Sequence, residues 1–388
     1  MKKILILLLV IFLSACPQKQ EEKQEETVVS KVELLPIPFS QIVGWNEDNF
    51  AEFIPVFANN CKRILKLKSE WLGNSEIKIK TESYKQICKE FEKQNLQTND
   101  AFKTFIENNF EPYLVTDNGN PEGKFTSYYE SRINASFQKN ETYKYPVYGK
   151  PEDLIEINLQ DFDESLPNKK FFGMVSDQKM VPYHDRKTIE TQNIGAPVLM
   201  WADSLVDIHI MQIQGSAVAY MDNGEKVRVG YAANNGRPFK GIGRILLDNK
   251  VLPPEKINMI EIKKWLNENP EEAEKFMQMN RRYIFHKIIN ESGPLGAFGV
   301  PLQAGRCLAV DKSIVPLGSL LWIATNDAEK NQINKLVAAQ DVGSAIKGIV
   351  RGDYFWGSGD DDVLAKAGSM NSKGIYYIFL PKGNSDEQ

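Results

Sequence analysis

The stretch Val337–Gly359, VAAQDVGSAIKGIVRGDYFWGSG, decides how the rest of the chain is interpreted. An apolar run ends at Asp341, and a second acidic residue, Asp353, precedes an aromatic triplet at 354–356. Two carboxylates beside glycines fit a cleft built from loops. Aromatic side chains beside an acid suit sugar rings, which stack on them while the acid acts on the bridging oxygen. Taken alone, the pattern also fits a turn aspartate and core aromatics.

Composition indicates a globular chain with room for two domains. The 388 residues are 25% charged and 42% hydrophobic, and the net charge is −4. This acidic balance, without a basic stripe or a known RNA-binding motif, argues against a nucleic-acid partner.

The first residues read as a targeting segment rather than as part of the fold. Two lysines precede the apolar run 4–13, and Ser14, Ala15 and Cys16 follow, which is typical of a secretory signal peptide over residues 1–15. LSAC resembles a bacterial lipobox with a lipid on Cys16. A plain signal peptide or a membrane anchor is the alternative, although the run is short for a span. Residues 16–38 predict a disordered tether, and Pro17 favours an outer-membrane lipoprotein facing the periplasm.

Apolar spacing predicts helices over about 45–65, 84–91 and 102–110. Cys61 and Cys88 lie on the first two, so they form either a disulfide or two buried thiols. Cys307 is then expected as a buried free thiol in a strand. Because no cysteine or histidine spacing suits zinc, we predict neither a metal nor a cofactor.

Further along, the patterns predict two strand regions and two helices. Residues 123–130, GKFTSYYE, read as a strand. HIMQIQGS at 209–216 also reads as a strand, with a hairpin turn at Asn223-Gly224, so that Gln212 and Gln214 share one face. Residues 254–286 read as two helices split before Pro270, with Asn269 capping the second.

These blocks together resemble the membrane-bound lytic murein transglycosylase A family over residues 123–381. The C-terminal block resembles its 3D domain, named for three aspartates that match Asp311, Asp341 and Asp353. VPYHDR at 181–186 and the tyrosine-rich segments match further family motifs. The resemblance implies a mainly β fold with helices (α+β). A double-psi β-barrel domain, residues 39–125 and 265–388 with the N-terminal helices, would hold an inserted β-barrel at 126–264, with a cleft between them.

The resemblance also assigns site residues. Asp353 is expected as the catalytic acid and base, and Asp341 as its neighbour, although the two roles could be exchanged. Asp311 is expected to be structural. Lys347 would offset the charge of Asp341 or simply be solvated, and Gln214 would contact glycan or satisfy local backbone. The full set expected at the substrate is Tyr128, Tyr129, Gln214, Gly215, Ser216, Asn234, Lys347, Tyr354 and Trp356.

The implied activity is lytic transglycosylation of peptidoglycan, which needs only one acid/base and forms a 1,6-anhydro sugar. The expected partners are peptidoglycan glycan strands and the membrane of the lipid anchor, with a monomeric chain and cell-wall synthesis complexes as candidate associates. Two other functions stay open: a hydrolase that uses both aspartates and water, and a lipoprotein that binds peptidoglycan without cutting it.

Overall fold

Three helices follow the start of the chain in the computed structural model, which describes residues 30–291, 293–359 and 361–383. They are α1 (Ile54–Ile64), α2 (Thr81–Lys93) and α3 (Asn99–Asn109), preceded by the 3-10 helices η1 (Phe39–Gln41) and η2 (Phe50–Phe53). The first helix therefore begins later than the apolar spacing predicted, at a turn that contains Pro55, where a missing N–H costs nothing. The signal peptide, Cys16 and most of the tether lie outside the described residues.

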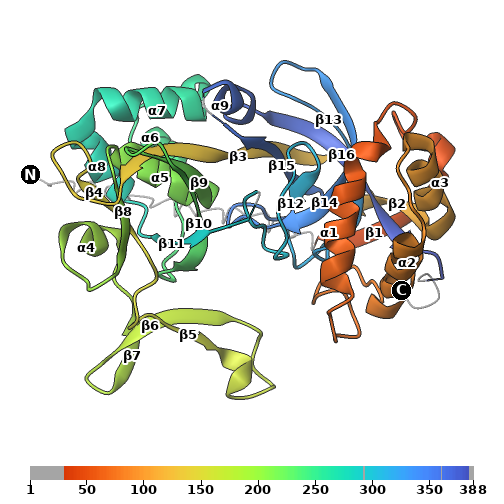
Figure 1. The fold of residues 1–388 in the computed structure, drawn as a ribbon, viewed down its shortest axis with the longest axis horizontal. Coiled ribbons are helices and arrows are strands. Elements are labelled where there is room, and N and C mark those ends of the chain that lie inside the picture. The colour runs from red at the N-terminus through yellow and green to blue at the C-terminus, as the bar shows by residue number, and fades with distance from the viewer. Residues whose placement is uncertain (1–29, 292, 360, 384–388) are drawn as a thin grey trace, which may run out of the picture. The chain divides into compact units, whose positions relative to one another are not determined.

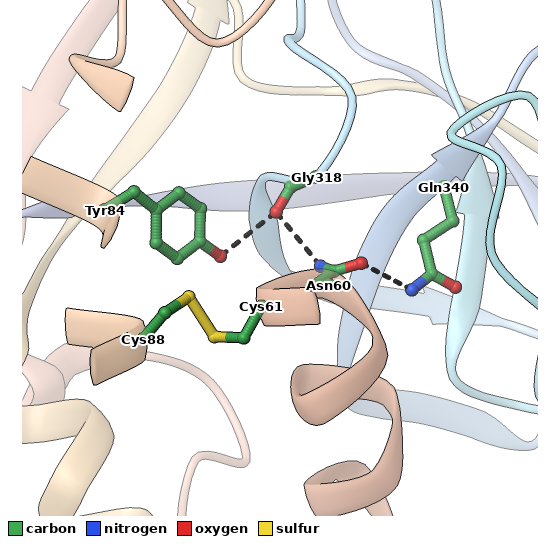
Figure 2. The surroundings of a disulfide bond; sticks show 6 residues. All are labelled: Asn60, Cys61, Tyr84, Cys88, Gly318 and Gln340. Atoms are coloured by element: carbon green, nitrogen blue, oxygen red, sulfur yellow. Dashed lines mark hydrogen bonds between the residues drawn. A yellow bond between two sulfur atoms is a disulfide. The ribbon is translucent and has the colours of Figure 1, made fainter. Parts of the chain in front are cut away.

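A disulfide joins Cys61 of α1 to Cys88 of α2 (Figure 2). Beside it, the Asn60 amide and the Tyr84 hydroxyl both donate to the Gly318 carbonyl, at 3.1 and 3.0 Å. The helices are thus fastened both to each other and to the loop that precedes β13 (Leu320–Asn326).

Six strands pair in a closed circuit, in the order β3, β16, β13, β14, β12, β15 and back to β3. Two of these pairings, β12 with β14 and β15 with β3, are parallel. The circuit encloses part of the largest apolar core, and β1 and β2 extend it through β16. The bounds are β1 (Val32–Pro36), β2 (Phe110–Asp117), β3 (Gly123–Ser136), β12 (Cys307–Ala309), β14 (Gln332–Asp341), β15 (Arg351–Ser358) and β16 (Asn371–Pro381).

The long strand β3 belongs to two groups of strands (Figure 1). Its first half pairs with β15 and β16, and its second half, Ser131–Ala135, pairs in parallel with β9. The second group consists of β4 (Tyr145–Tyr148), β8 (Val198–Ala202), β9 (Ser216–Met221), β10 (Lys226–Asn234) and β11 (Ile284–Ile289). A separate small sheet holds β5 (Ile155–Asn158), β6 (Lys170–Ser176) and β7 (Lys179–Pro182).

The remaining helices all follow β5 along the chain. They are η3 (Leu159–Asp161), α4 (Arg186–Thr191), α5 (Leu205–Gln214), α6 (Ile242–Asp248), η4 (Pro254–Lys256), α7 (Met259–Glu268), α8 (Pro270–Gln278) and α9 (Asp361–Ala367). The predicted break before Pro270 is present. However, the Asn269 side chain donates to the Trp265 carbonyl of α7 and does not cap α8. Among the described residues, no helix is both long and apolar enough to cross a bilayer.

The segment HIMQIQGS was wrongly predicted as a strand, because most of it lies in α5. The Ser204 hydroxyl accepts from the Asp207 N–H at 3.1 Å and caps the helix, and Gly215 ends it with φ of 91°. The helix is buried on nearly every side. The alternation of apolar and polar residues in this run therefore could not distinguish the repeat of a helix from that of a strand. Gln212 and Gln214 therefore do not share a strand face. The hairpin turn at Asn223-Gly224 between β9 and β10 is present as predicted.

Candidate active site

Two aspartates stand on either side of the short strand β12. Ala309 of β12 is the register partner of Asp341, the last residue of β14, and also of Asp353 in β15. Since neighbouring strands lie about 4.8 Å apart, the two aspartate backbones are roughly 10 Å apart. Both side chains border one cavity of about 290 Å³ and are partly exposed to it. The fold thus brings the two predicted acids to one site.

Protein donors hold both oxygens of Asp341. The Ala297 N–H donates to Oδ1 at 3.0 Å, and the Tyr128 hydroxyl donates to Oδ2 at 2.9 Å. Burial raises the pKa of Asp341 to about 6, against the lowering effect of these hydrogen bonds and one from the Val342 N–H. The charge of Asp353 raises that pKa further, so the two carboxylates interact electrostatically.

Asp353 has a different set of partners. The Thr126 hydroxyl donates to its Oδ1, and Arg351 Nη2 donates to the Thr126 oxygen at 2.6 Å. Burial raises the pKa of Asp353, while Thr126 and Arg351 lower it. In the described part of the chain no donor reaches its second oxygen, Oδ2. That oxygen is free to meet a ligand.

The opposite wall of the cavity comes from the segments around β9–β11. Arg186 is fully buried there, and its guanidinium is committed to the carbonyls of Asn280 and Arg282 and to Glu190. It therefore supports the wall rather than offering a free charge. The lining on this side consists of Arg186, Gln212, Ile213, Gln214, Phe239, Met259, Asn280, Arg282 and Ile284.

Only part of the expected substrate set borders this cavity. Tyr128 and Gln214 line it. Gln214 Oε1 also accepts from the Tyr129 N–H at 3.2 Å, so it does satisfy local backbone. The other expected members are absent from its described lining: Tyr129, Gly215, Ser216, Asn234, Lys347, Tyr354 and Trp356.

Strand alternation explains why Tyr354 and Trp356 do not line this cavity. Because successive residues of β15 point to opposite faces, Asp353 faces the cavity while Tyr354 points into the core, where its hydroxyl donates to the Gly305 carbonyl. Trp356 packs 5.1 Å from Tyr354, ring centre to ring centre. Phe355 packs against Tyr128, whose hydroxyl donates to Asp341.

Lys347 and Asn234, which also do not line this cavity, have local structural contacts instead. Lys347 pairs with Asp311 at 3.0 Å and not with Asp341. Asp311 also accepts from the backbone N–H groups of Ser313 and Gly348, as a turn residue does. The Asn234 Oδ1 accepts from the Gly236 N–H within its own turn.

Three cavity residues that were not anticipated are Thr126, Arg351 and Arg282. A signal for the first was available, because Thr126 precedes Tyr128 by two positions in a predicted strand and so shares its face. Arg351 could have been found in the same way from Asp353. Nothing local pointed to Arg282. Among the described residues, no group of three or more His, Cys, Asp or Glu side chains is placed to hold a metal ion.

Comparison with known proteins identifies the family. The family description "MltA specific insert domain" matches residues 124–287, and "3D domain" matches residues 306–380, which together exceed half of the chain. The chain belongs to the membrane-bound lytic murein transglycosylase A family. The insert-domain match contains α4, α5 and the strands β4 to β10, whereas the 3D-domain match contains both aspartates.

Curated relatives carry the family name. The chain is 29% identical over 235 residues to the membrane-bound lytic murein transglycosylase A homolog of Buchnera aphidicola, covering 58% of each chain. It is 28% identical over 235 residues to membrane-bound lytic murein transglycosylase A of Escherichia coli K12, covering 58% of this chain and 57% of that one. The aligned region thus spans little more than half the length of these relatives.

Solved structures of the family share the fold more completely. The membrane-bound lytic murein transglycosylase from Agrobacterium tumefaciens is 28% identical, with a TM-score of 0.80 over 90% of this chain and 98% of that one. MltA from Neisseria gonorrhoeae is 28% identical, with a TM-score of 0.77 over 92% and 95%. The E. coli MltA solved with bound chitohexaose has the same fold at 21% identity, with a TM-score of 0.58 over 90% and 91%.

Proposed function

We propose that this protein is a lytic transglycosylase of peptidoglycan. It cleaves the β-1,4 bond between N-acetylmuramic acid and N-acetylglucosamine without water and leaves a 1,6-anhydro-muramic end. The observation that carries the proposal is the pair of aspartates with raised pKa values at one cavity, in a chain of this family. A raised pKa is what a carboxylic acid needs in order to donate a proton near neutral pH.

Asp353 acts as the single acid and base. Its free oxygen Oδ2 donates a proton to the bridging oxygen, and the bond from that oxygen to C1 of the muramic sugar breaks. The resulting carboxylate then takes the proton of the 6-hydroxyl, whose oxygen closes on C1. Asp353 ends as it began, protonated, and no water is consumed. Asp341 remains ionised and stabilises the positive charge at C1.

The position of the proton shared by the two aspartates decides which of them is the acid. The pKa of about 6 for Asp341 alone would favour the exchanged roles. Geometry favours Asp353, because both oxygens of Asp341 already accept hydrogen bonds from protein donors. As the two carboxylates interact, they titrate as a pair that retains one proton, and the uncommitted oxygen of Asp353 is where a substrate can take it.

The ligand class follows from the same cavity. Glycan strands of peptidoglycan are the proposed partner, with Tyr128 and Gln214 beside the acids as the first contacts. The E. coli protein of this fold was solved with chitohexaose, a chain of N-acetylglucosamine, which supports a glycan ligand for this cavity as well.

We further propose the finer architecture and the anchoring. The closed circuit of six strands supports a double-psi β-barrel formed by residues 39–125 and 265–388, with a second barrel inserted at 126–264. The relatives named membrane-bound support a membrane-associated chain. We propose that a lipid on Cys16, in the lipobox-like LSAC, holds it as a monomer at the outer membrane and facing the periplasm.

The deciding experiment digests intact sacculi with the soluble chain from Lys31 onwards, which contains all the cores described. Mass spectrometry of the products compares it with Asp353→Asn and Asp341→Asn. We expect products one water lighter than reducing muropeptides. Asp353→Asn should abolish them, and Asp341→Asn should slow their formation at least a hundredfold.

Each other result has a separate meaning. Full loss with Asp341→Asn alone would exchange the two roles. Reducing products would make the protein a two-carboxylate hydrolase. Sacculi that are bound but not cut by any form would make it a peptidoglycan-binding lipoprotein.

A further inference from the structure

Arg282 lies between α8 and β11, on the cavity wall that faces the aspartates. Its positive charge has no acidic partner among the described residues. The side chain is half-buried, and burial lowers the pKa of its guanidinium. No described carboxylate lies within ion-pair distance of it, whereas its neighbour Arg281 pairs with Asp185 at 3.5 Å. A partly desolvated cation without a counter-charge is costly, so its placement at a cavity calls for a ligand.

The donors of Arg282 are also largely uncommitted. The hydrogen bond that its side chain makes in the described chain is from Nη1 to the Arg237 carbonyl, at a long 3.4 Å. Arg351, on the aspartate side, differs, since its guanidinium donates to Thr126 and to the carbonyls of Lys124 and Gly352. Arg186 is likewise fully engaged. Arg282 is therefore the arginine of this lining with a free face.

An unpartnered amide lines the same wall. The Gln212 side chain is 6% exposed, and neither its oxygen nor its nitrogen has a hydrogen-bond partner of normal geometry in the described chain, although the Tyr283 hydroxyl is near. A buried amide in this state is completed by a ligand or by water. A guanidinium fork and an amide nitrogen together supply the donors that a carboxylate accepts.

We propose that Arg282, assisted by Gln212, binds a carboxylate carried by the muramic acid of the substrate. The inference rests on the proposed function and names the substrate group that these residues recognise. Muramic acid differs from glucosamine by a lactyl ether, whose carboxyl group is either free or amide-linked to a peptide stem that bears carboxylates of its own. Such a ligand is repelled by ionised Asp341, and Arg282 offsets that repulsion.

The test measures binding of three glycans of matched length in the Asp353→Asn background, which prevents turnover. Chitohexaose carries no carboxylate, glycan stripped of its stems carries the lactyl carboxylate, and intact glycan carries the stem carboxylates. Arg282→Gln is compared with Arg281→Gln, which removes the same charge one position away, from an exposed residue outside the lining. Arg282→Lys keeps the charge but loses the fork.

We expect Arg282→Gln to weaken binding of at least one carboxylate-bearing glycan roughly tenfold, with chitohexaose changed less than twofold. The glycan affected identifies the lactyl group or the stem as the source. Arg281→Gln should be neutral, Arg282→Lys intermediate, and the excess affinity of the wild-type wall should fall with salt. Equal weakening for chitohexaose, or no weakening for either carboxylate-bearing glycan, overturns the proposal.

Failure of the proposed function has a different signature. If the chain without the Asp353 substitution binds the carboxylate-bearing glycans through Arg282 but releases no anhydro products, the transglycosylase proposal fails while the carboxylate site stands. Thermal unfolding of each variant, with melting temperatures within about 2 °C of the parent, confirms that the comparison concerns binding and not folding.

Discussion

At the scale of single residues, the site consists of two similar acids with different partners. Both oxygens of Asp341 accept hydrogen bonds from protein donors. In Asp353 one oxygen accepts from Thr126, which itself accepts from Arg351, and the other oxygen is free. In the proposed mechanism the same residue type has two roles that depend on its surroundings, because hydrogen bonds and burial act on the pKa in opposite directions.

Thr126→Val should move the pH profile. The Thr126 hydroxyl lowers the pKa of Asp353, so its removal raises that pKa further. Since the acid must be protonated, activity falls as pH rises through this pKa, and the falling limb should shift to higher pH. The measurement is kcat/KM against pH on isolated glycan strands. A downward shift, or an unchanged limb with reduced kcat, would show that Asp353 is not the acid.

Asp341→Asn should stabilise the protein at neutral pH. The folded pKa of Asp341, about 6, lies above the ordinary value of 3.8, so its contribution to stability is present below pH 3.8 and is lost as pH rises through 6. The neutral variant escapes that loss. We expect it to gain about 1–2 kcal/mol in free energy of unfolding at pH 7.5 and little at pH 4. Urea unfolding at both pH values tests this, and an equal gain at each would contradict it.

At the scale of elements, a buried polar chain links the helices to the strand that ends at Asp341. Cys307 of β12 donates its thiol proton to Gln340 Oε1. Gln340 Nε2 donates to Asn60 Oδ1 at 2.6 Å, and Asn60 in turn donates to the Gly318 carbonyl, as Figure 2 shows. Asn60 and Gln340 are fully buried, next to the disulfide of Cys61. Such a network orients its members strongly, because each unmade bond would be costly.

Asn60→Ala should therefore lower both stability and turnover. It leaves the Gln340 amide without its acceptor, which should cost about 2–3 kcal/mol in free energy of unfolding. Because Gln340 precedes Asp341, kcat should fall severalfold with little change in KM. The matched control is Asn59→Ala, one position along the same helix and partly exposed. Equal effects at both positions, in urea unfolding and in kinetics, would mean that Asn60 contributes only as a residue of the helix and not through its hydrogen bond to Gln340.

At the scale of the whole described unit, an ion pair joins segments 258 residues apart. Arg306 Nη1 and Nη2 meet Asp48 Oδ2 and Oδ1 at 2.6 and 2.9 Å, and both side chains are buried. The Leu336 N–H also donates to Asp48 at 3.0 Å. The segment before η2 is in this way tied to β12 and β14, the strands that position the acids.

Asp48→Ala should destabilise the protein by about 3–5 kcal/mol, because it leaves the Arg306 charge buried and partly unpaired. Glu52→Ala removes another acid from the same arginine, but its side chain is 53% exposed and the loss should stay below about 1 kcal/mol. Urea unfolding of both variants tests the difference. Similar losses of unfolding free energy in the two variants would mean that burial does not determine how much the Asp48–Arg306 ion pair contributes to stability.

Local sequence patterns were sufficient to predict several elements of the fold and a pair of candidate acids. The three helices, the break before Pro270 and the hairpin at Gly224 followed from local periodicity and turn residues, which neighbouring residues are sufficient to specify. The two acids were proposed from the resemblance to a family motif. The sequence also narrowed the pairing of Cys61 and Cys88 to two alternatives, and the tertiary structure has the disulfide.

Only the tertiary structure decided which residues share the cavity. HIMQIQGS is buried on nearly every side, including His209 and Gln212, so its period could not separate a helix from a strand. Tyr354 and Trp356 pack against the core and do not line the cavity, because strand alternation, not proximity to Asp353 in the sequence, decides which side chains face it. Arg282 reaches the wall from a segment whose spacing carries no such information. Pairing across β12 and burial are long-range properties, and a local pattern does not encode them.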